Sequence, residues 1–275
     1  MRKKAVWVIA VLGLFVSLPF IIPEALSLSN RDYISFSDES GKHHRMKREE
    51  VMMGAVLSMM GEDAPDEAYK AAAVVVSTII EGGMYHPNFE ENYLICDVSQ
   101  FSEDKRLRVA ELISAVDGQI LLYDGKPITA AFHESSGGST VSYESIFGED
   151  KPYLRAVESD KVTENQLITR ERLRILYGDD SSFSVVSSSE DGAVKEVLCS
   201  SGKISGEQFR NDCGIYSTVF TISEDESGII VTSYGLGHQV GLSLSGAKEK
   251  AEGGSRYDEI LLHYYSGAVL GKSVK

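Results

Sequence analysis

The sequence predicts an α+β fold, and three features of its patterning support this class. Two early stretches, 49–60 and 65–80, carry small and apolar residues over helical lengths. Beyond residue 120, short apolar runs have a period near two, which is typical of half-buried strands. Helical and strand patterns do not alternate regularly, so the βαβ units of a parallel sheet are not expected. We expect a helical hairpin packed with antiparallel β-hairpins around a substrate groove, preceded by an N-terminal transmembrane helix.

The N-terminal segment predicts a membrane anchor. Arg2, Lys3 and Lys4 precede 18 uncharged residues, Ala5–Ile22. As a helix this run would extend about 27 Å, nearly the thickness of a bilayer core. The basic flank should stay cytoplasmic, which places the body of the chain outside the cell membrane as a single-pass protein. A cleaved signal peptide is the alternative, but residues 23–26 provide no small-x-small cleavage site.

The composition predicts how the rest of the chain is divided and limits the kinds of partner that it binds. Residues 23–48 are polar without hydrophobic periodicity and predict a stalk, followed by one domain over 49–275. Lys and Arg total 27 against 41 Asp and Glu, giving a formal net charge of −14. An acidic chain is poorly suited to neutralising phosphates, so a nucleic-acid partner is excluded.

Helix boundaries follow from capping residues. Gly61 closes the first helix, and Pro65 opens the second, where a first helical turn tolerates proline. Asp66 and Glu67 favour the positive end of the second helix dipole. Further helices are predicted at Asp104–Val116, Glu164–Tyr177, Ser205–Asp212, Gly246–Gly253 and Tyr257–Tyr265.

The predicted strands form hairpins through turn residues. Glu190-Asp191-Gly192 and Glu226-Ser227-Gly228 supply turn chemistry between neighbouring runs, so two hairpins are expected. The strands are predicted at Ile120–Tyr123, Ile128–Phe132, Phe183–Ser187, Ala193–Cys199, Val219–Ile222 and Ile229–Ser233.

The three cysteines are too few for a disulfide framework. An extracytoplasmic body would permit one bridge, Cys199 to Cys213, leaving Cys96 unpaired. The alternative is that they are small buried hydrophobic residues, since no cysteine and histidine cluster has metal-ligand spacing. We predict no metal and no cofactor.

Two segments have the composition of a binding site. His133–Thr140 follows an apolar run, and its glycines and hydroxyls allow backbone N–H groups to approach a ligand, so a binding loop is predicted. Gly235–Ser243 places His238 between glycines, which suits an imidazole at the floor of a cleft. The alternative for His238 is a structural histidine in a tight turn.

Taken in order, seven motifs resemble the stage II sporulation protein D family, which includes the amidase enhancer domain. The resemblance extends from about Glu49 to Leu270. The motifs are Glu49-Glu50 with Gly54, Glu67–Ala71, His133–Thr140, Pro152–Ser159, Ile204–Arg210, Gly237–Ser243 with Gly246-Ala247, and Tyr257–Leu261 with His263–Tyr265.

The resemblance implies a membrane-anchored lytic transglycosylase that acts on peptidoglycan glycan strands during sporulation engulfment, in the mother-cell membrane facing the forespore. It also implies a cell-wall amidase as partner. In this chemistry one carboxylic acid protonates the glycosidic oxygen and then serves as base. The residues carried over as substrate-binding are His133, Ser135, Ser136, Gly137, Gly138, Thr140, Tyr153, His238, Gly241 and Ser243.

One departure from the family pattern affects the catalytic position. The resemblance places the acid eight residues before Glu67, where this chain has Met59. A thioether does not donate a proton, so the acid is absent and a glycan-binding pseudoenzyme is expected. The alternative is an active lytic transglycosylase with a displaced carboxylate, Glu62 or Glu134. Restoring the acid with Met59→Glu should create activity if the surroundings have not repacked around the thioether.

Overall fold

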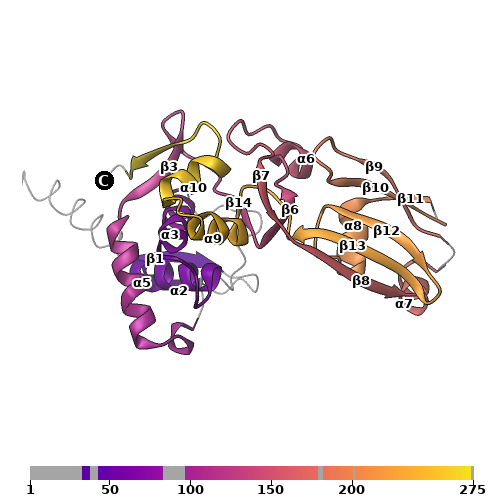
Figure 1. Cartoon of the computed structure of the whole chain (residues 1–275), viewed down its shortest axis with the longest axis horizontal. Coiled ribbons are helices and arrows are strands. Elements are labelled where there is room, and N and C mark those ends of the chain that lie inside the picture. Colours follow the sequence, from indigo (N-terminus) through magenta and orange to yellow (C-terminus); the bar gives the residue numbers. More distant parts are fainter. Residues whose placement is uncertain (1–32, 38–42, 83–96, 179–181, 201, 274–275) are drawn as a thin grey trace, which may run out of the picture.

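The computed structural model describes residues 33–37, 43–82, 97–178, 182–200 and 202–273. The prediction of an α+β class with antiparallel sheets is confirmed (Figure 1). A helical lobe lies at one end and a strand-rich lobe lies at the other. Between them lie α6 (Tyr143–Phe147), β6 (Ser135–Ser139), β7 (Glu158–Lys161) and β14 (Leu242–Ser243).

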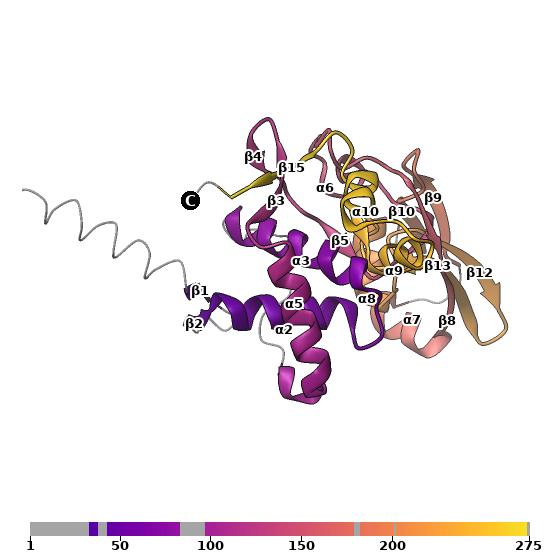
Figure 2. The same cartoon turned by 60° about the vertical axis from the view of Figure 1, so that its left-hand side comes forward.

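The helical lobe is built on the predicted hairpin of α2 and α3. Its helices are α2 (Arg48–Met60), α3 (Asp66–Glu81), α5 (Glu103–Ala115), α9 (Leu244–Glu252) and α10 (Tyr257–Tyr264), with the short η1 (Val98–Gln100). Gly61 ends α2 with a positive φ of 68°, and its N–H donates to the Leu57 carbonyl at 2.8 Å, as the sequence predicted. The Tyr69 hydroxyl donates to the Gly61 carbonyl at 2.6 Å, which ties the turn back to α3. Figure 2 shows α5 crossing both helices.

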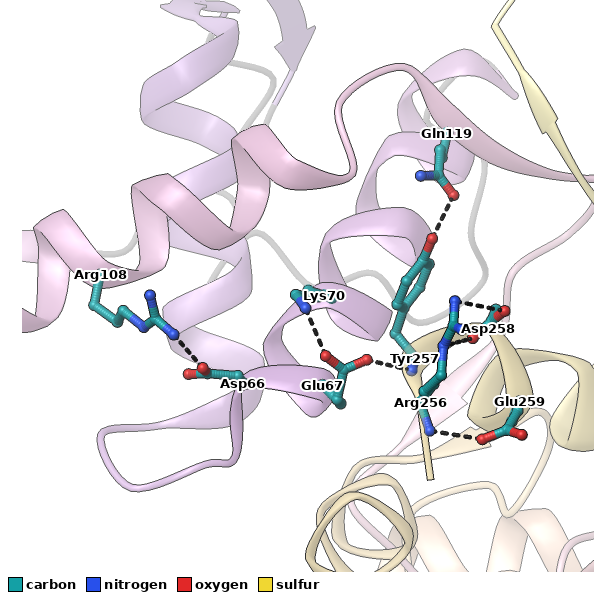
Figure 3. A network of polar contacts seen from close by, with 9 residues as sticks. All are labelled: Asp66, Glu67, Lys70, Arg108, Gln119, Arg256, Tyr257, Asp258 and Glu259. Atoms are coloured by element: carbon teal, nitrogen blue, oxygen red, sulfur yellow. Dashed lines mark hydrogen bonds and ion pairs between the residues drawn. The ribbon is translucent and has the colours of Figure 1, made fainter. Parts of the chain in front are cut away.

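The C-terminal segment packs onto the start of α3 through the polar network of Figure 3. The Glu67 carboxylate accepts hydrogen bonds from Lys70 Nζ at 2.5 Å and from the Tyr257 N–H, 190 residues away, at 2.8 Å. Burial acts to raise the pKa of Glu67, but these bonds and the charge of Arg256 outweigh it and the net pKa is lowered. Glu67 is therefore a charged anchor for the N-terminus of α10 and is not available as an acid at neutral pH.

The strand-rich lobe contains the two predicted hairpins. β9 (Ser184–Ser188) pairs with β10 (Val194–Cys199), and β12 (Phe220–Asp225) pairs with β13 (Gly228–Leu236), both antiparallel. β11 (Gly202–Ser205) extends the first pair, and α8 (Gly206–Cys213) packs against β10. Phe209, Phe183 and Phe220 form the aromatic part of a core separate from that of the helical lobe.

The predicted helix at Glu164–Tyr177 is only half correct. Residues Thr163–Thr169 form β8, which pairs antiparallel with β13, and only Arg170–Tyr177 form a helix, α7. Pairing with a neighbouring strand overrides helical propensity here, and Ile168 is buried against the second core. The Thr169 hydroxyl accepts a hydrogen bond from the Arg172 N–H at 3.3 Å and begins the helix.

The predicted strand at Ile128–Phe132 is wrong except for Phe132. β4 (Lys126–Pro127) and β5 (Phe132–His133) flank residues outside regular structure. β4 pairs with β3 (Gln119–Tyr123), and β15 (Val269–Lys272) pairs with the other edge of β3.

The predicted stalk contains an antiparallel hairpin of β1 (Tyr33–Ser37) and β2 (His43–Lys47), which the sequence did not indicate. The side chain of Ile34 is buried against Val51 of α2. The domain limits stay a prediction. The predicted anchor, residues 1–22, and Cys96 lie outside the described residues. None of the helices in the described ranges is both long and apolar enough to cross a bilayer.

Cys199 and Cys213 are buried in the core of the strand-rich lobe and are not bridged to each other. The Cys199 thiol donates to the Gly202 carbonyl at 3.1 Å. The structure therefore favours the alternative of small buried hydrophobic residues over a bridge.

Candidate functional site

The two segments singled out from the sequence meet between the lobes. β5 pairs in parallel with β14 (Leu242–Ser243), so His133 lies beside Ser243, and Val141 bridges Val240. Gly241 permits this approach: its φ is 75°, and a Cβ there would lie 2.0 Å from the Ala131 carbonyl oxygen. The pairing joins segments about a hundred residues apart into one wall.

The predicted binding loop is mostly a strand. Ser135–Ser139 form β6, which pairs with β7 (Glu158–Lys161) and with the end of β13. Gly137 is required because a Cβ there would lie 2.5 Å from the Tyr234 Cβ. The glycines and serines therefore serve close strand packing, a use that their composition did not distinguish from a loop.

His133 is buried in this wall between two fixed partners. Its Nε2 lies 2.8 Å from Ser136 Oγ, and its Nδ1 lies 3.2 Å from the Val240 carbonyl oxygen. Because a carbonyl only accepts, we assign the ring proton to Nδ1, and Nε2 accepts from the Ser136 hydroxyl.

Burial lowers the pKa of His133 to about 4, despite the opposing effects of the Val240 carbonyl and Asp160. The ring is therefore neutral at pH 7. With its single proton donated to a backbone carbonyl, His133 has none to give to a substrate.

Asp160 connects the two segments and was not singled out from the sequence. Its carboxylate accepts hydrogen bonds from the Ser136 N–H at 3.1 Å, from Ser159 Oγ at 2.8 Å and from Ser243 Oγ at 2.6 Å. Asp160 is buried, and Ser159 Oγ lies 2.8 Å from the Tyr264 hydroxyl. A buried carboxylate with several donors is a fixed structural element that holds β6, β7 and the start of α9 together.

His238 lines a cavity next to this wall. Its Nδ1 accepts from the Val240 N–H at 2.9 Å, so the neutral ring carries its proton on Nε2. Its ring centroid lies 5.9 Å from that of His133 and 5.8 Å from that of Phe147. The prediction placed His238 at a cleft floor, and its side chain does line a cavity, although only 7% of the residue is exposed.

This cavity, which we call the α6–α8 pocket, has a volume of about 220 Å³. Its apolar wall contains Ile146 and Phe147 of α6 (Tyr143–Phe147) and Val194. Polar and charged residues complete it: Ser145, Lys195, Ser205, Glu207, Arg210, Thr218 and His238, with Gly206.

Two contacts hold the walls of the pocket in place. The Ser142 N–H at the start of α6 donates to Asp191 Oδ2 at 2.8 Å, and Lys195 Nζ donates to the Ser145 carbonyl. Gly206 lets α8 begin directly on β10, because a Cβ there would lie 2.1 Å from the Val194 carbonyl oxygen. The sequence had assigned Asp191 only to a turn.

Most of the predicted substrate-binding side chains are buried. His133, Ser135, Ser136, Thr140, His238, Gly241 and Ser243 are buried, whereas Gly137, Gly138 and Tyr153 are partly exposed. The Tyr153 hydroxyl accepts from the Thr129 N–H at 3.2 Å. The substrate-binding role of these residues stays a prediction. Most of them lie buried within the wall and not on an exposed surface.

The three residues considered for the acid lie in different surroundings. Met59 is 3% exposed in the last turn of α2, within the apolar core of the helical lobe. Glu62 and Glu134 are exposed. The backbone carbonyl of Glu134 accepts from the Ser245 N–H at 3.0 Å, which fixes its backbone near the start of α9.

Lys195 and Arg210 of the pocket were not singled out as site residues, although Arg210 closes one of the quoted motifs. They come from β10 and α8, and only the packing of that helix on that strand brings them together. Within the described residues, no group of three or more histidine, cysteine or acidic side chains is arranged to hold a metal.

Comparisons with known proteins identify similar chains. The chain is 28% identical over 255 residues to stage II sporulation protein D of Bacillus amyloliquefaciens, with 82% of this chain and 74% of that protein covered. It is 27% identical to the Bacillus subtilis protein of the same name, with the same coverage. It is 24% identical over 223 residues to the amidase enhancer of Bacillus subtilis, with 58% of this chain and 32% of that protein covered. No family model matches the chain.

Proposed function

The chain is a divergent member of the stage II sporulation protein D family, and we propose that it is a cell-wall protein of sporulation that binds peptidoglycan glycan strands without cleaving them. The names of the relatives support a role in sporulation and a link to a cell-wall amidase. The proposal that it does not cleave rests on the residues of this chain.

The burial of Met59 is the observation that carries the proposal. At the position where the resemblance expects the acid, the side chain is apolar and packed in the core of α2 and α3. This packing supports the proposal that the surroundings have closed around the thioether and no longer suit a carboxylate. Loss of a positioned general acid commonly removes about two to four orders of magnitude of rate.

His133 does not replace the missing acid. Its pKa of about 4 keeps the ring neutral at pH 7, and its Nδ1 proton is held by the Val240 carbonyl. The buried Asp160 carboxylate is occupied by donors from Ser136, Ser159 and Ser243. Neither group is placed to protonate a glycosidic oxygen on the surface.

The second candidate function is an active lytic transglycosylase that uses Glu62 or Glu134. The exposure of both side chains favours it, since a solvent-facing carboxylate is accessible to a strand. We rank it second because ordinary loop carboxylates also face solvent.

The proposed cellular setting follows from the sequence and the relatives. We propose that residues 5–22 anchor the chain in the cell membrane with its body extracytoplasmic, which the uncharged run and its basic flank support. A glycan-binding protein held there would bring an amidase partner to its substrate.

The test uses the full chain in mild detergent with peptide-stripped glycan strands. Co-sedimentation measures binding, and mass spectrometry measures anhydromuramic ends, with an active lytic transglycosylase as the positive control for product detection. We expect binding without products, in the natural chain and in Glu62→Gln and Glu134→Gln alike. Products that disappear in one of these variants would establish the second candidate function. Failure to bind strands would refute both.

A further inference from the structure

The α6–α8 pocket has the chemistry of an anion site on an otherwise acidic protein. Two of its lining side chains are cationic, Lys195 and Arg210, and one is anionic, Glu207. The whole chain carries a formal net charge of −14, so a cavity with a cationic balance departs from its average surface. We propose that this pocket is a subsite for a carboxylate-bearing sugar, which deepens the proposed function and rests on it.

Arg210 provides the main argument. Its Nε is buried and has no hydrogen-bond partner among the described residues. A buried donor without a partner is unfavourable, and a bound acceptor would satisfy it. The planar guanidinium matches a carboxylate through two parallel N–H···O bonds, so a carboxylate is the expected ligand group.

Lys195 adds a second positive charge to the same cavity. It lies on β10, while Arg210 lies one turn into α8, which begins against that strand. Its Nζ donates to the Ser145 carbonyl, which holds the ammonium group near α6. An ammonium group has three donors, so one hydrogen bond leaves donors for a ligand.

Glu207 opposes these charges. Glu207 and Lys195 are both exposed, so solvent screens these two side chains, whereas Arg210 is partly buried. Arg210 is therefore the least screened charge of the cavity, and the Glu207 carboxylate is a hydrogen-bond acceptor for hydroxyl groups.

The remaining wall favours a sugar ring over a small free anion. Ile146, Phe147 and Val194 contribute apolar surface to the lining of the cavity. A pyranose ring has an apolar C–H face that packs on such a wall, and aromatic rings such as that of Phe147 are favourable partners. A volume of about 220 Å³ suits a ligand of about one sugar unit.

The experiment compares two sugars that differ by the acidic substituent. N-acetylmuramic acid carries a lactyl carboxylate and N-acetylglucosamine does not. Binding to the full chain is measured by titration with ligand-observed NMR. We expect N-acetylmuramic acid to bind about tenfold more tightly, and this preference to weaken as salt is raised. Equal binding of the two sugars would refute the subsite, even if glycan strands still bind, so the proposed function is tested separately.

Variants assign the preference to the pocket. Arg210→Gln should remove the preference, and Lys195→Gln should reduce it several-fold. Lys203→Gln is the matched control, because Lys203 pairs with Glu196 on the neighbouring strand outside the pocket and loses the same charge. A preference that survives Arg210→Gln would refute the assignment, as would an equal loss in Lys203→Gln.

Two further measurements complete the test. One distinguishes a loss of contact from a loss of folding, and the other distinguishes a sugar carboxylate from a peptide carboxylate. Arg210→Lys keeps the charge without the planar fork, and a partly retained preference in a folded variant supports direct contact if Arg210→Gln is unstable. D-alanyl-D-alanine, a peptide carboxylate, should bind more weakly than N-acetylmuramic acid. Tighter binding of the dipeptide would overturn the sugar assignment.

Discussion

Acidification should destabilise the fold through His133. The imidazole has an ordinary pKa of 6.5, and burial lowers this to about 4 in the folded chain. Because the folded state resists protonation, the contribution to stability is complete above pH 6.5 and is lost as the pH falls toward 4. The gap between the two pKa values corresponds to about 3 kcal/mol when the titration is complete, of which about 2 kcal/mol is lost between pH 7 and pH 5.

The measurement is urea unfolding of the full chain at several pH values, compared with that of His133→Asn. The variant lacks the titrating ring, so the natural chain should lose about 2 kcal/mol more than the variant between pH 7 and pH 5. Ser136→Ala is the matched control: it removes the partner of Nε2 but leaves the ring buried, so its pH dependence should follow that of the natural chain. Parallel curves for the natural chain and His133→Asn would show that the ring is not buried as described.

Three other substitutions test the wall and the core. Asp160→Asn should lower the free energy of unfolding by about 2 kcal/mol, because an amide accepts fewer of the three hydrogen bonds, and an unchanged denaturant midpoint would contradict this network. Gly241→Ala should destabilise far more than Gly254→Ala in thermal unfolding: both have positive φ, but only the first would place a Cβ against a carbonyl, so equal effects would argue against the close approach. Met59→Glu should destabilise more than Met59→Leu by several kcal/mol and yield no anhydro products, and a stable, active Met59→Glu would show that the position opens to substrate.

The features that the sequence predicted correctly depend on neighbouring residues. Gly61 ends α2 because the residue directly after the last turn has a positive φ, which glycine adopts without strain. The turn at Glu226-Ser227-Gly228 joins β12 and β13, and these two paired strands directly flank it in the sequence. Such signals are complete within a short window, so one sequence is enough to read them.

The features that it missed depend on distant partners. The residues of β8 have helix-compatible composition, and only pairing with β13 makes them a strand. Asp160 has no local motif, and its role depends on Ser136 and Ser243, which lie in other segments. Lys195 and Arg210 likewise share a cavity only because α8 packs on β10.

The hydrogen bonds that fix the wall are independent of α2, which under the proposed function would allow binding to outlast catalysis. The contacts that fix the wall join His133 to Ser136 and Asp160 to Ser243, and none of them includes a residue of α2. Met59 shares an apolar core with Phe132, Val240 and Leu242 of the wall, so a substitution there reaches the wall through packing and not through these hydrogen bonds. Retention of the wall is expected whether or not the acid is present, so preserved motifs do not argue for cleavage. The decision between the two candidate functions rests on the proton donor alone, which is why product analysis of the natural chain is the deciding measurement.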